Sequence, residues 1–269
     1  MTNKLFLKTA AYAVIASFAS GGAAVAADYS ISVGMSSYDY GLRIQTSVLS
    51  DFSFDGEQYE FSLQRATPNH TMSVKHTFSD QVDIADPAEK LSSAYGETTY
   101  MSQEETSFSI QKPANETVSW FAGYYQSRLD GKGHNDGDGS FYNEVHHWLE
   151  TSGLFVGLAA QKQVSDRVVL FGRGAYQMLS ANIYLDSDEK SDDDVNIQRQ
   201  VSVGSGAYGV DGSATLISLG LAYPLQSGAT MVLSYEAKEF DFDDFYLQRT
   251  KSSVDYDWNT VGLSINFTL

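Results

Sequence analysis

The last ten residues alternate strictly between two kinds of side chain. Every second position is apolar: Val261, Leu263, Ile265, Phe267 and Leu269. The positions between them, from Thr260 to Thr268, hold only small or polar residues. Successive side chains of a β-strand point to opposite faces of the sheet. The segment therefore predicts a strand with one wholly apolar face and one polar face.

The same period of two recurs along the chain and predicts ten strands. In most of them one face is apolar, as in Tyr59, Phe61 and Leu63, while the positions between are polar. His76 interrupts one apolar face, and the fifth predicted strand is aromatic on both faces. The predicted strands cover about residues 28–40, 56–66, 70–79, 104–112, 117–129, 150–163, 167–185, 212–223, 229–241 and 256–269.

The connections between these strands alternate in length. The short ones cover residues 67–69, 113–116, 164–166 and 224–228. The long ones are polar and rich in acids, and cover about residues 41–55, 80–103, 130–149, 186–211 and 242–255. An even number of strands, with short turns at one end and long loops at the other, is typical of bacterial outer-membrane barrels.

We therefore predict an all-β fold, a closed antiparallel transmembrane β-barrel of about ten strands. Closure removes the free sheet edges, as a bilayer requires. Eight strands is the smaller alternative, in which the chain before Tyr100 holds only one membrane strand. A soluble β-sandwich would also explain the alternation. It explains less well the loop rhythm and the apolar last residue, Leu269.

Residues 1–27 have the composition of a cleaved signal peptide. Lys4 and Lys8 precede an apolar run that ends in small residues, and Val25 and Ala27 fit the positions before a cleavage site. The expected organisation is therefore a signal peptide over 1–27 and a barrel domain over 28–269. No later segment is apolar for long enough to form a transmembrane helix.

The charge and composition exclude several classes of protein. The net charge is −17, and loss of two lysines with the signal peptide would make it −19. Such an acidic chain is not expected to bind nucleic acid. The absence of cysteine excludes disulfides and thiolate metal sites. A hydrophobic content of 42% argues against intrinsic disorder.

The signal-like 1–27 and the terminal alternating strand together resemble small Gram-negative outer-membrane β-barrel proteins as a class. The residues from Val261 to Leu269 resemble the C-terminal signal read by the barrel-assembly machinery, although Leu269 stands where phenylalanine is usual. The segments 219–225 and 231–235 resemble the penultimate hairpin of such domains. The resemblance implies export through the periplasm to the outer membrane. It also implies a monomer whose partners are membrane lipid, lipopolysaccharide and the assembly machinery.

Catalytic motifs of known outer-membrane barrel enzymes are absent. The omptin proteases use an aspartate pair and an Asp-x-His pair, and no Asp-x-His occurs in this chain. The nearest candidates are His134 with Asp136, and Glu144 with His146 and His147. The His-x-Ser pair of lipid A deacylases is also absent, and no Ser-His-Asn set of the phospholipase kind can be located. We therefore expect no enzymatic activity.

Two acidic clusters are weak candidates for a metal site. The first contains Asp186, Asp188, Asp192 and Asp194, and the second contains Glu239, Asp241, Asp243 and Asp244. Carboxylate oxygens suit Ca²⁺, but neither run has the glycine and terminal glutamate of an EF-hand loop. A solvated acidic loop, kept soluble by charge repulsion, explains them better. We expect no bound metal and no cofactor.

The polar strand faces are expected to line the lumen if the apolar faces meet lipid. The short turn at 67–69 would bring Glu60 close to Lys75. Ten strands leave a narrow interior, so pairing of inward charges would close the lumen. The predicted lumen-lining residues are Gln58, Glu60, Gln64, Lys75, Gln161, Arg173, Gln177, Glu236 and Lys238. Tyr29, Trp120, Tyr223 and Trp258 are expected in the aromatic girdles.

These observations predict a non-enzymatic outer-membrane barrel with acidic extracellular loops, in a structural or surface-interaction role. A narrow porin-like channel lined by the same polar residues is the alternative. A hydrolase carried on the loops, using His134, His146 or His147, is a third hypothesis.

Overall fold

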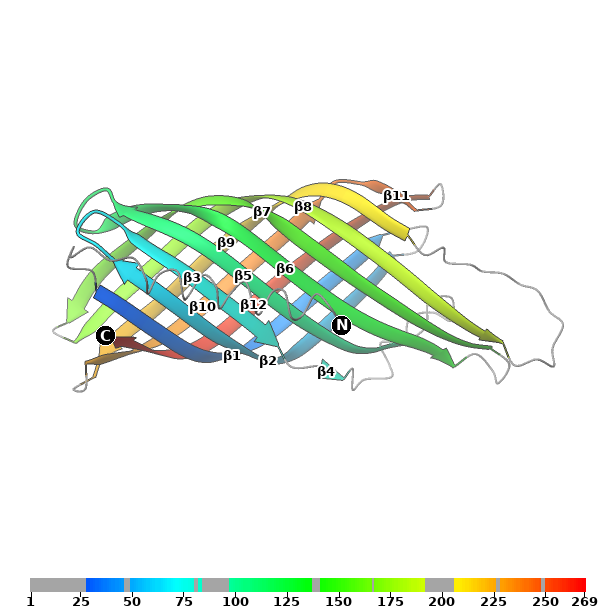
Figure 1. The fold of residues 1–269 in the computed structure, drawn as a ribbon, viewed down its shortest axis with the longest axis horizontal. Coiled ribbons are helices and arrows are strands. Elements are labelled where there is room, and N and C mark those ends of the chain that lie inside the picture. Colours follow the sequence, from blue (N-terminus) through cyan, green and yellow to red (C-terminus); the bar gives the residue numbers. More distant parts are fainter. Residues whose placement is uncertain are drawn as a thin grey trace, which may run out of the picture.

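A computed structural model shows a closed antiparallel β-barrel (Figure 1). It describes residues 28–45, 49–79, 82–83, 97–136, 141–165, 167–191, 206–225, 228–247 and 250–269. The ten long strands are β1 (Asp28–Gln45), β2 (Leu49–Ala66), β3 (Thr71–Ser79), β5 (Glu97–Pro113), β6 (Val118–Asp136), β7 (Phe141–Ser165), β8 (Val168–Ser191), β9 (Gly206–Pro224), β10 (Ala229–Phe242) and β12 (Thr250–Thr268). Two short strands, β4 (Val82–Asp83) and β11 (Phe245–Leu247), pair with β5 and β12.

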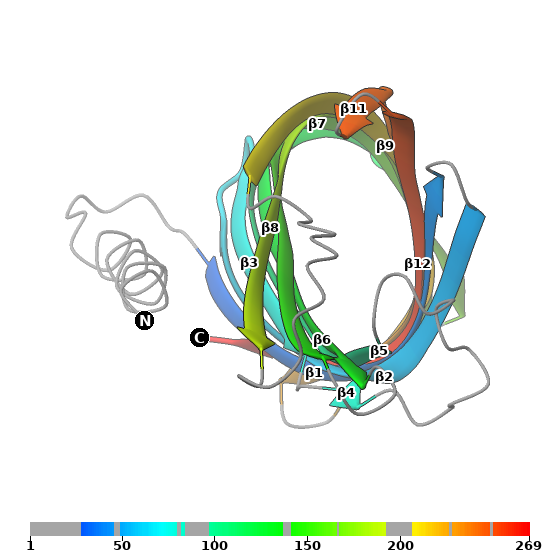
Figure 2. The ribbon, with the colours of Figure 1, turned by 90° about the vertical axis from the view of Figure 1, so that its right-hand side faces the viewer.

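The long strands pair with their neighbours in chain order, and β1 pairs with β12 to close the ring (Figure 2). The closing seam runs from Ser30 opposite Thr268 to Gln45 opposite Ser253. Closure gives each long strand a partner on both sides, so no long edge is left to face lipid. The predicted ten-stranded barrel is confirmed, and the eight-stranded alternative is wrong.

The strands run further than predicted at the long-loop end. β7 and β8 remain paired as far as Phe141 opposite Ser191, and β1 and β2 as far as Gln45 opposite Leu49. Much of the predicted loops 41–55, 130–149 and 186–211 is therefore strand. A membrane crossing needs only about 9–11 residues, so these strands continue well beyond the bilayer. Polar residues on both faces hide such extensions from a periodicity argument.

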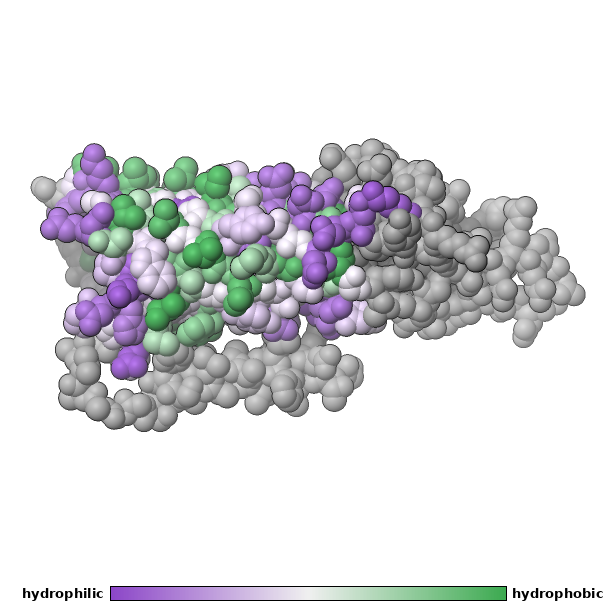
Figure 3. Space-filling view, turned by 90° about the horizontal axis from the view of Figure 1, so that it is seen from above, coloured by the Kyte–Doolittle hydropathy of each residue, from purple (hydrophilic) through white to green (hydrophobic). Residues whose placement is uncertain are grey.

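Large apolar side chains cover the outside of the barrel next to the short turns. Figure 3 shows them as a band between two hydrophilic zones. The band includes Val33, Met35, Leu154, Val156, Leu158, Ile217, Leu219, Leu221, Leu233, Val261 and Leu263, each at least 43% exposed. An apolar belt of this kind around a closed barrel is the surface that meets lipid in an outer-membrane protein. No helix within the described ranges is long and apolar enough to cross a membrane.

The apolar face changes sides as the strands leave this belt. In β12, Val261 and Leu263 are exposed on the outside, whereas Tyr256 and Trp258 are buried inside and Asp257 is exposed between them. An outer face next to lipid must be apolar, and an outer face next to water can be polar. The change of sides therefore marks the boundary of the membrane belt on the side of the long loops, which we call the upper side.

The same change of sides occurs in two other strands. In β10, Leu233 is exposed on the outside, whereas Phe240 and Phe242 are buried. In β1, Met35 is exposed and Tyr38 is buried. Above the boundary the barrel therefore has an apolar interior, as a soluble barrel does. The belt between this boundary and the short turns is the membrane-spanning part.

The prediction that Trp258 lies in an aromatic girdle is wrong. Trp258 is only 4% exposed and stacks on Tyr38 inside the barrel, with ring centroids 4.6 Å apart. Trp258 lies above the boundary, where its face of β12 has already turned inward. Trp120, by contrast, is 40% exposed on the outer face.

Candidate functional site

The lumen is the candidate functional site, because most of the predicted site residues project into it. Alternation fixes the direction of each side chain: Met231, Leu233 and Tyr235 of β10 are exposed on the outside, so Glu236 and Lys238 at the opposite parity point toward one interior space. Two consecutive residues cannot share a face of a regular strand, but positions 236 and 238 can.

Lys238 makes an ion pair across the lumen. Its Nζ donates hydrogen bonds to both carboxylate oxygens of Glu105, at 2.8 and 2.7 Å, and lies 3.4 Å from Oε1 of Glu236. Glu105 is on β5 and Lys238 is on β10, which are five strands apart in either direction around the ten-stranded ring. The pair therefore bridges opposite walls. The two side chains are only 6% and 10% exposed.

A second ion pair joins neighbouring strands. Lys75 Nζ of β3 lies 2.8 Å from Glu60 Oε2 of β2, as expected from the short turn between them. The two side chains are 28% and 29% exposed, so water reaches this pair more easily than the Lys238 pair. Among the side chains that the structure describes, three inward-facing cations, Lys75, Arg173 and Lys238, stand against three inward-facing carboxylates, Glu60, Glu105 and Glu236.

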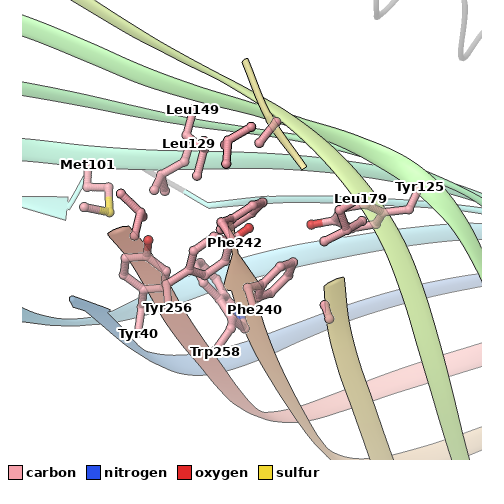
Figure 4. Packing of buried hydrophobic residues seen from close by; sticks show 14 of the residues in the cluster. Tyr40, Met101, Tyr125, Leu129, Leu149, Leu179, Phe240, Phe242, Tyr256 and Trp258 are labelled. Carbon is pink, nitrogen blue, oxygen red and sulfur yellow. The ribbon is translucent and has the colours of Figure 1, made fainter. Parts of the chain in front are cut away.

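A cluster of buried, mostly aromatic side chains lies inside the barrel (Figure 4). On β10 its members Phe240 and Phe242 follow Lys238 toward the long-loop end. Phe240 of β10 stacks on Tyr256, with ring centroids 4.0 Å apart. The ring of Tyr125 on β6 is tilted against that of Phe240, with centroids 6.4 Å apart. We call this set the aromatic plug: Tyr38, Tyr40, Tyr125, Phe240, Phe242, Tyr256 and Trp258, none of them more than 6% exposed. Leu129, Leu149 and Leu179 pack against it.

The aromatic plug and the cross-lumen ion pair are joined. Lys238 Nζ lies 5.6 Å from the ring centre of Tyr125, a cation–π distance. Sequence reasoning missed the plug because it treated every inward face as polar. The signal was present in β10, where the apolar residues move from odd positions such as Leu233 to even positions such as Phe240.

The remaining predicted lumen residues differ in exposure. Gln177 is buried at 3%, and Gln58 and Gln64 are partly buried. Gln161 and Arg173 also have inward parity, but they are exposed near the short turns. The C-terminal residues Val261, Leu263, Phe267 and Leu269 are exposed on the outer face, and Ile265 is partly buried. Their role in assembly stays a prediction.

The catalytic and metal candidates lie on the strand extensions or beyond the described residues. His134 is opposite Glu97 and Glu144 in the register, and His146 is opposite Lys132 and Asp186. Asp188 is opposite Glu144, whereas Asp192, Asp194 and the predicted signal peptide lie outside the described residues. In the part of the chain that the structure describes, no three His, Cys, Asp or Glu side chains are placed to hold a metal ion.

Comparison with known proteins supports the fold. No protein-family model and no curated protein sequence matches the chain. The outer-membrane protease OmpT from Escherichia coli is similar in structure, with a TM-score of 0.53 and 11% identity over 90% of this chain and 96% of OmpT. The translocator domain of the autotransporter NalP from Neisseria meningitidis aligns with a TM-score of 0.45 and 11% identity, over 97% of each chain.

These values show an architecture and nothing finer. At 11% identity the likeness to OmpT establishes that the chain has the fold of a Gram-negative outer-membrane β-barrel, and fold does not determine function. The fold and the apolar belt together place the protein in the bacterial outer membrane.

Proposed function

We propose that this protein is a sealed, non-enzymatic outer-membrane barrel that presents an acidic surface to the outside of the cell. Its role is then structural or one of surface interaction. The observation that carries the proposal is the buried Lys238–Glu105 pair, which joins opposite walls beneath the aromatic plug.

The energetics of this pair support a closed lumen. Removing one partner of a buried ion pair typically costs about 3–5 kcal/mol, because the other charge is left without compensation. A state that separated Lys238 from Glu105 would likewise leave a buried carboxylate without its partner, so this separation is disfavoured. Passage through the plug would in addition require rings such as Phe240 and Tyr256 to separate.

The outer surface above the membrane belt is acidic. Asp39, Glu239, Asp241 and Asp257 are exposed on the outside of β1, β10 and β12. Together with the predicted acidic loops, they give the extracellular part its negative charge. Its contacts are expected with lipopolysaccharide and with cationic groups on other molecules, while the C-terminal strand is expected to be read by the assembly machinery.

The absence of enzymatic activity is part of the proposal. The sequence lacks the Asp-x-His and His-x-Ser pairs of known barrel hydrolases. Cleavage of peptide or ester substrates by the refolded barrel, abolished by replacing His134, His146 and His147, would contradict it.

Permeability of proteoliposomes tests the proposal. The refolded mature barrel, checked for its heat-modifiable gel shift, is placed in liposomes beside a general porin and protein-free liposomes. The proposal predicts that swelling in small sugars matches that of protein-free liposomes. Swelling that approaches the porin's rate would establish the channel alternative instead.

A further inference from the structure

Arg173 differs from the other two lumen cations in its surroundings. It lies on β8 at an inward position, opposite Ala159 and Ser218, and its side chain is exposed. Lys75 and Lys238 each lie within 2.8 Å of a glutamate. Among the residues that the structure describes, no carboxylate lies within ion-pair distance of Arg173. Glu236 lies two strands away in the same cross-strand row, with Ser218 between them, and its charge acts on Arg173 from beyond ion-pair distance. The guanidinium therefore has a carboxylate nearby but no direct carboxylate contact among the described residues.

One aromatic ring lies next to this guanidinium, and a second lies on the same face of β8. Arg173 Cζ lies 5.8 Å from the ring centre of Phe121, and Phe171 is two residues away on the same face of β8. Both rings lie over glycines of adjacent strands. A Cβ added at Gly157 would come within 2.5 Å of Phe121, and one added at Gly220 within 2.3 Å of Phe171. The glycines let the rings lie against the wall and leave the centre of the lumen to other groups.

Two inward-facing polar residues near the short turns are exposed. Gln161 and Arg173 point inward and are nevertheless exposed, so water reaches them. Further in, Lys238 is 6% exposed and the aromatic plug follows. Short turns face the periplasm in outer-membrane barrels, so a solute would enter from the periplasm.

We propose that the periplasmic end of the lumen binds a small organic anion. The carboxylate would take a two-pronged hydrogen bond from the Arg173 guanidinium, whose planar fork matches carboxylate geometry. The apolar body would pack on the rings of Phe121 and Phe171. The arrangement of mostly apolar walls around one orienting charge is typical of small-molecule sites. This site goes beyond the proposed function and requires neither a sealed nor a conducting lumen.

Fluorine NMR with 4-fluorobenzoate tests the site directly. The probe is titrated into the mature barrel in nanodiscs, with empty nanodiscs as the blank for partition into lipid. The variants are Arg173→Gln, Arg173→Lys and the matched control Arg167→Gln, which removes the same charge from an exposed position in the β7–β8 turn. All variants are first checked for the heat-modifiable gel shift.

The proposal predicts saturable binding by the wild type and by Arg167→Gln. Arg173→Gln should weaken binding about tenfold or more, the usual effect of losing a charge-assisted hydrogen bond. Arg173→Lys keeps the positive charge but lacks the planar guanidinium, so its affinity should lie between those of the wild type and Arg173→Gln. The neutral analogue 4-fluorobenzamide should bind at least tenfold more weakly than the acid.

Two results would overturn the proposal. One is equal binding by the wild type and Arg173→Gln, and the other is no saturable binding beyond that of empty nanodiscs. If inorganic phosphate competes as strongly as benzoate, the rings of Phe121 and Phe171 do not contribute to binding. The proposed organic-anion site would then be refuted in favour of a general anion site. If the liposomes swell while this binding is intact, the proposal of a sealed barrel is contradicted and the proposal of an anion site stands.

Discussion

Replacing Lys238 with methionine removes the central charge of the lumen while keeping most of the side-chain volume. Lys238 lies 2.7–2.8 Å from Glu105 and 3.4 Å from Glu236, and only 6% of its side chain is exposed. The variant Lys238→Met would leave two carboxylates facing each other in a space closed by the aromatic plug. Removing one member of a buried pair typically costs about 3–5 kcal/mol of unfolding free energy.

Two other variants set the scale. Glu105→Gln leaves Lys238 with Glu236 as a partner. This variant should therefore lose less unfolding free energy than Lys238→Met. Lys75→Met breaks a pair whose members are 28% and 29% exposed, so water compensates part of the lost interaction and the cost should be smaller than that of Lys238→Met. The predicted order of destabilisation is therefore Lys238→Met, then Glu105→Gln, then Lys75→Met.

Reversible unfolding in urea, followed by tryptophan fluorescence in lipid vesicles, measures these differences. The comparison holds only where the slope of the transition is unchanged between variants. If Lys238→Met lowers the unfolding free energy no more than Lys75→Met does, the cross-lumen pair does not stabilise the closed lumen. The proposal of a sealed lumen is then refuted.

Three further predictions follow from the packing. Phe240→Ala should cost about 3–5 kcal/mol of unfolding free energy, because the ring is 2% exposed inside the plug, and a loss below 1 kcal/mol would mean the plug is loosely packed. Leu158→Arg should cost about 2–4 kcal/mol in vesicle unfolding, because Leu158 is 62% exposed to lipid, whereas Glu239→Arg above the belt should cost little. Gly157→Ala should reduce the yield of folded barrel on gels, because its Cβ would lie 2.3 Å from Gly174 O, whereas Gly174→Ala, with 3.8 Å to its nearest neighbour, should refold normally.

The barrel could be predicted from the sequence because a bilayer imposes a simple rule on strands. Each crossing must show an apolar outer face, and segments such as 229–235 and 261–267 obey it strictly. The contact of Glu60 with Lys75 was also within reach, because one short turn joins their strands. These inferences need only local pattern and turn length.

The seal could not be predicted in the same way. Glu105 and Lys238 are 133 residues apart, and they meet only because the ring closes with β5 opposite β10. Strand pattern alone does not give the stagger that sets which inward residues share a level. The plug was missed for another reason: outside the membrane the rule reverses, so Trp258 belongs to the interior although Leu263 on the same strand faces lipid.

Single-channel conductance of the refolded mature barrel in a planar bilayer tests the sealed lumen most directly. A sealed lumen predicts a silent baseline for the wild type at moderate voltage. It predicts discrete openings for the double variant Lys238→Ala with Phe240→Ala, which removes the cross-lumen ion pair and part of the aromatic plug. Discrete steps in the wild type, with an ion selectivity altered by Glu105→Gln, would contradict a sealed lumen and show that this barrel is a narrow channel.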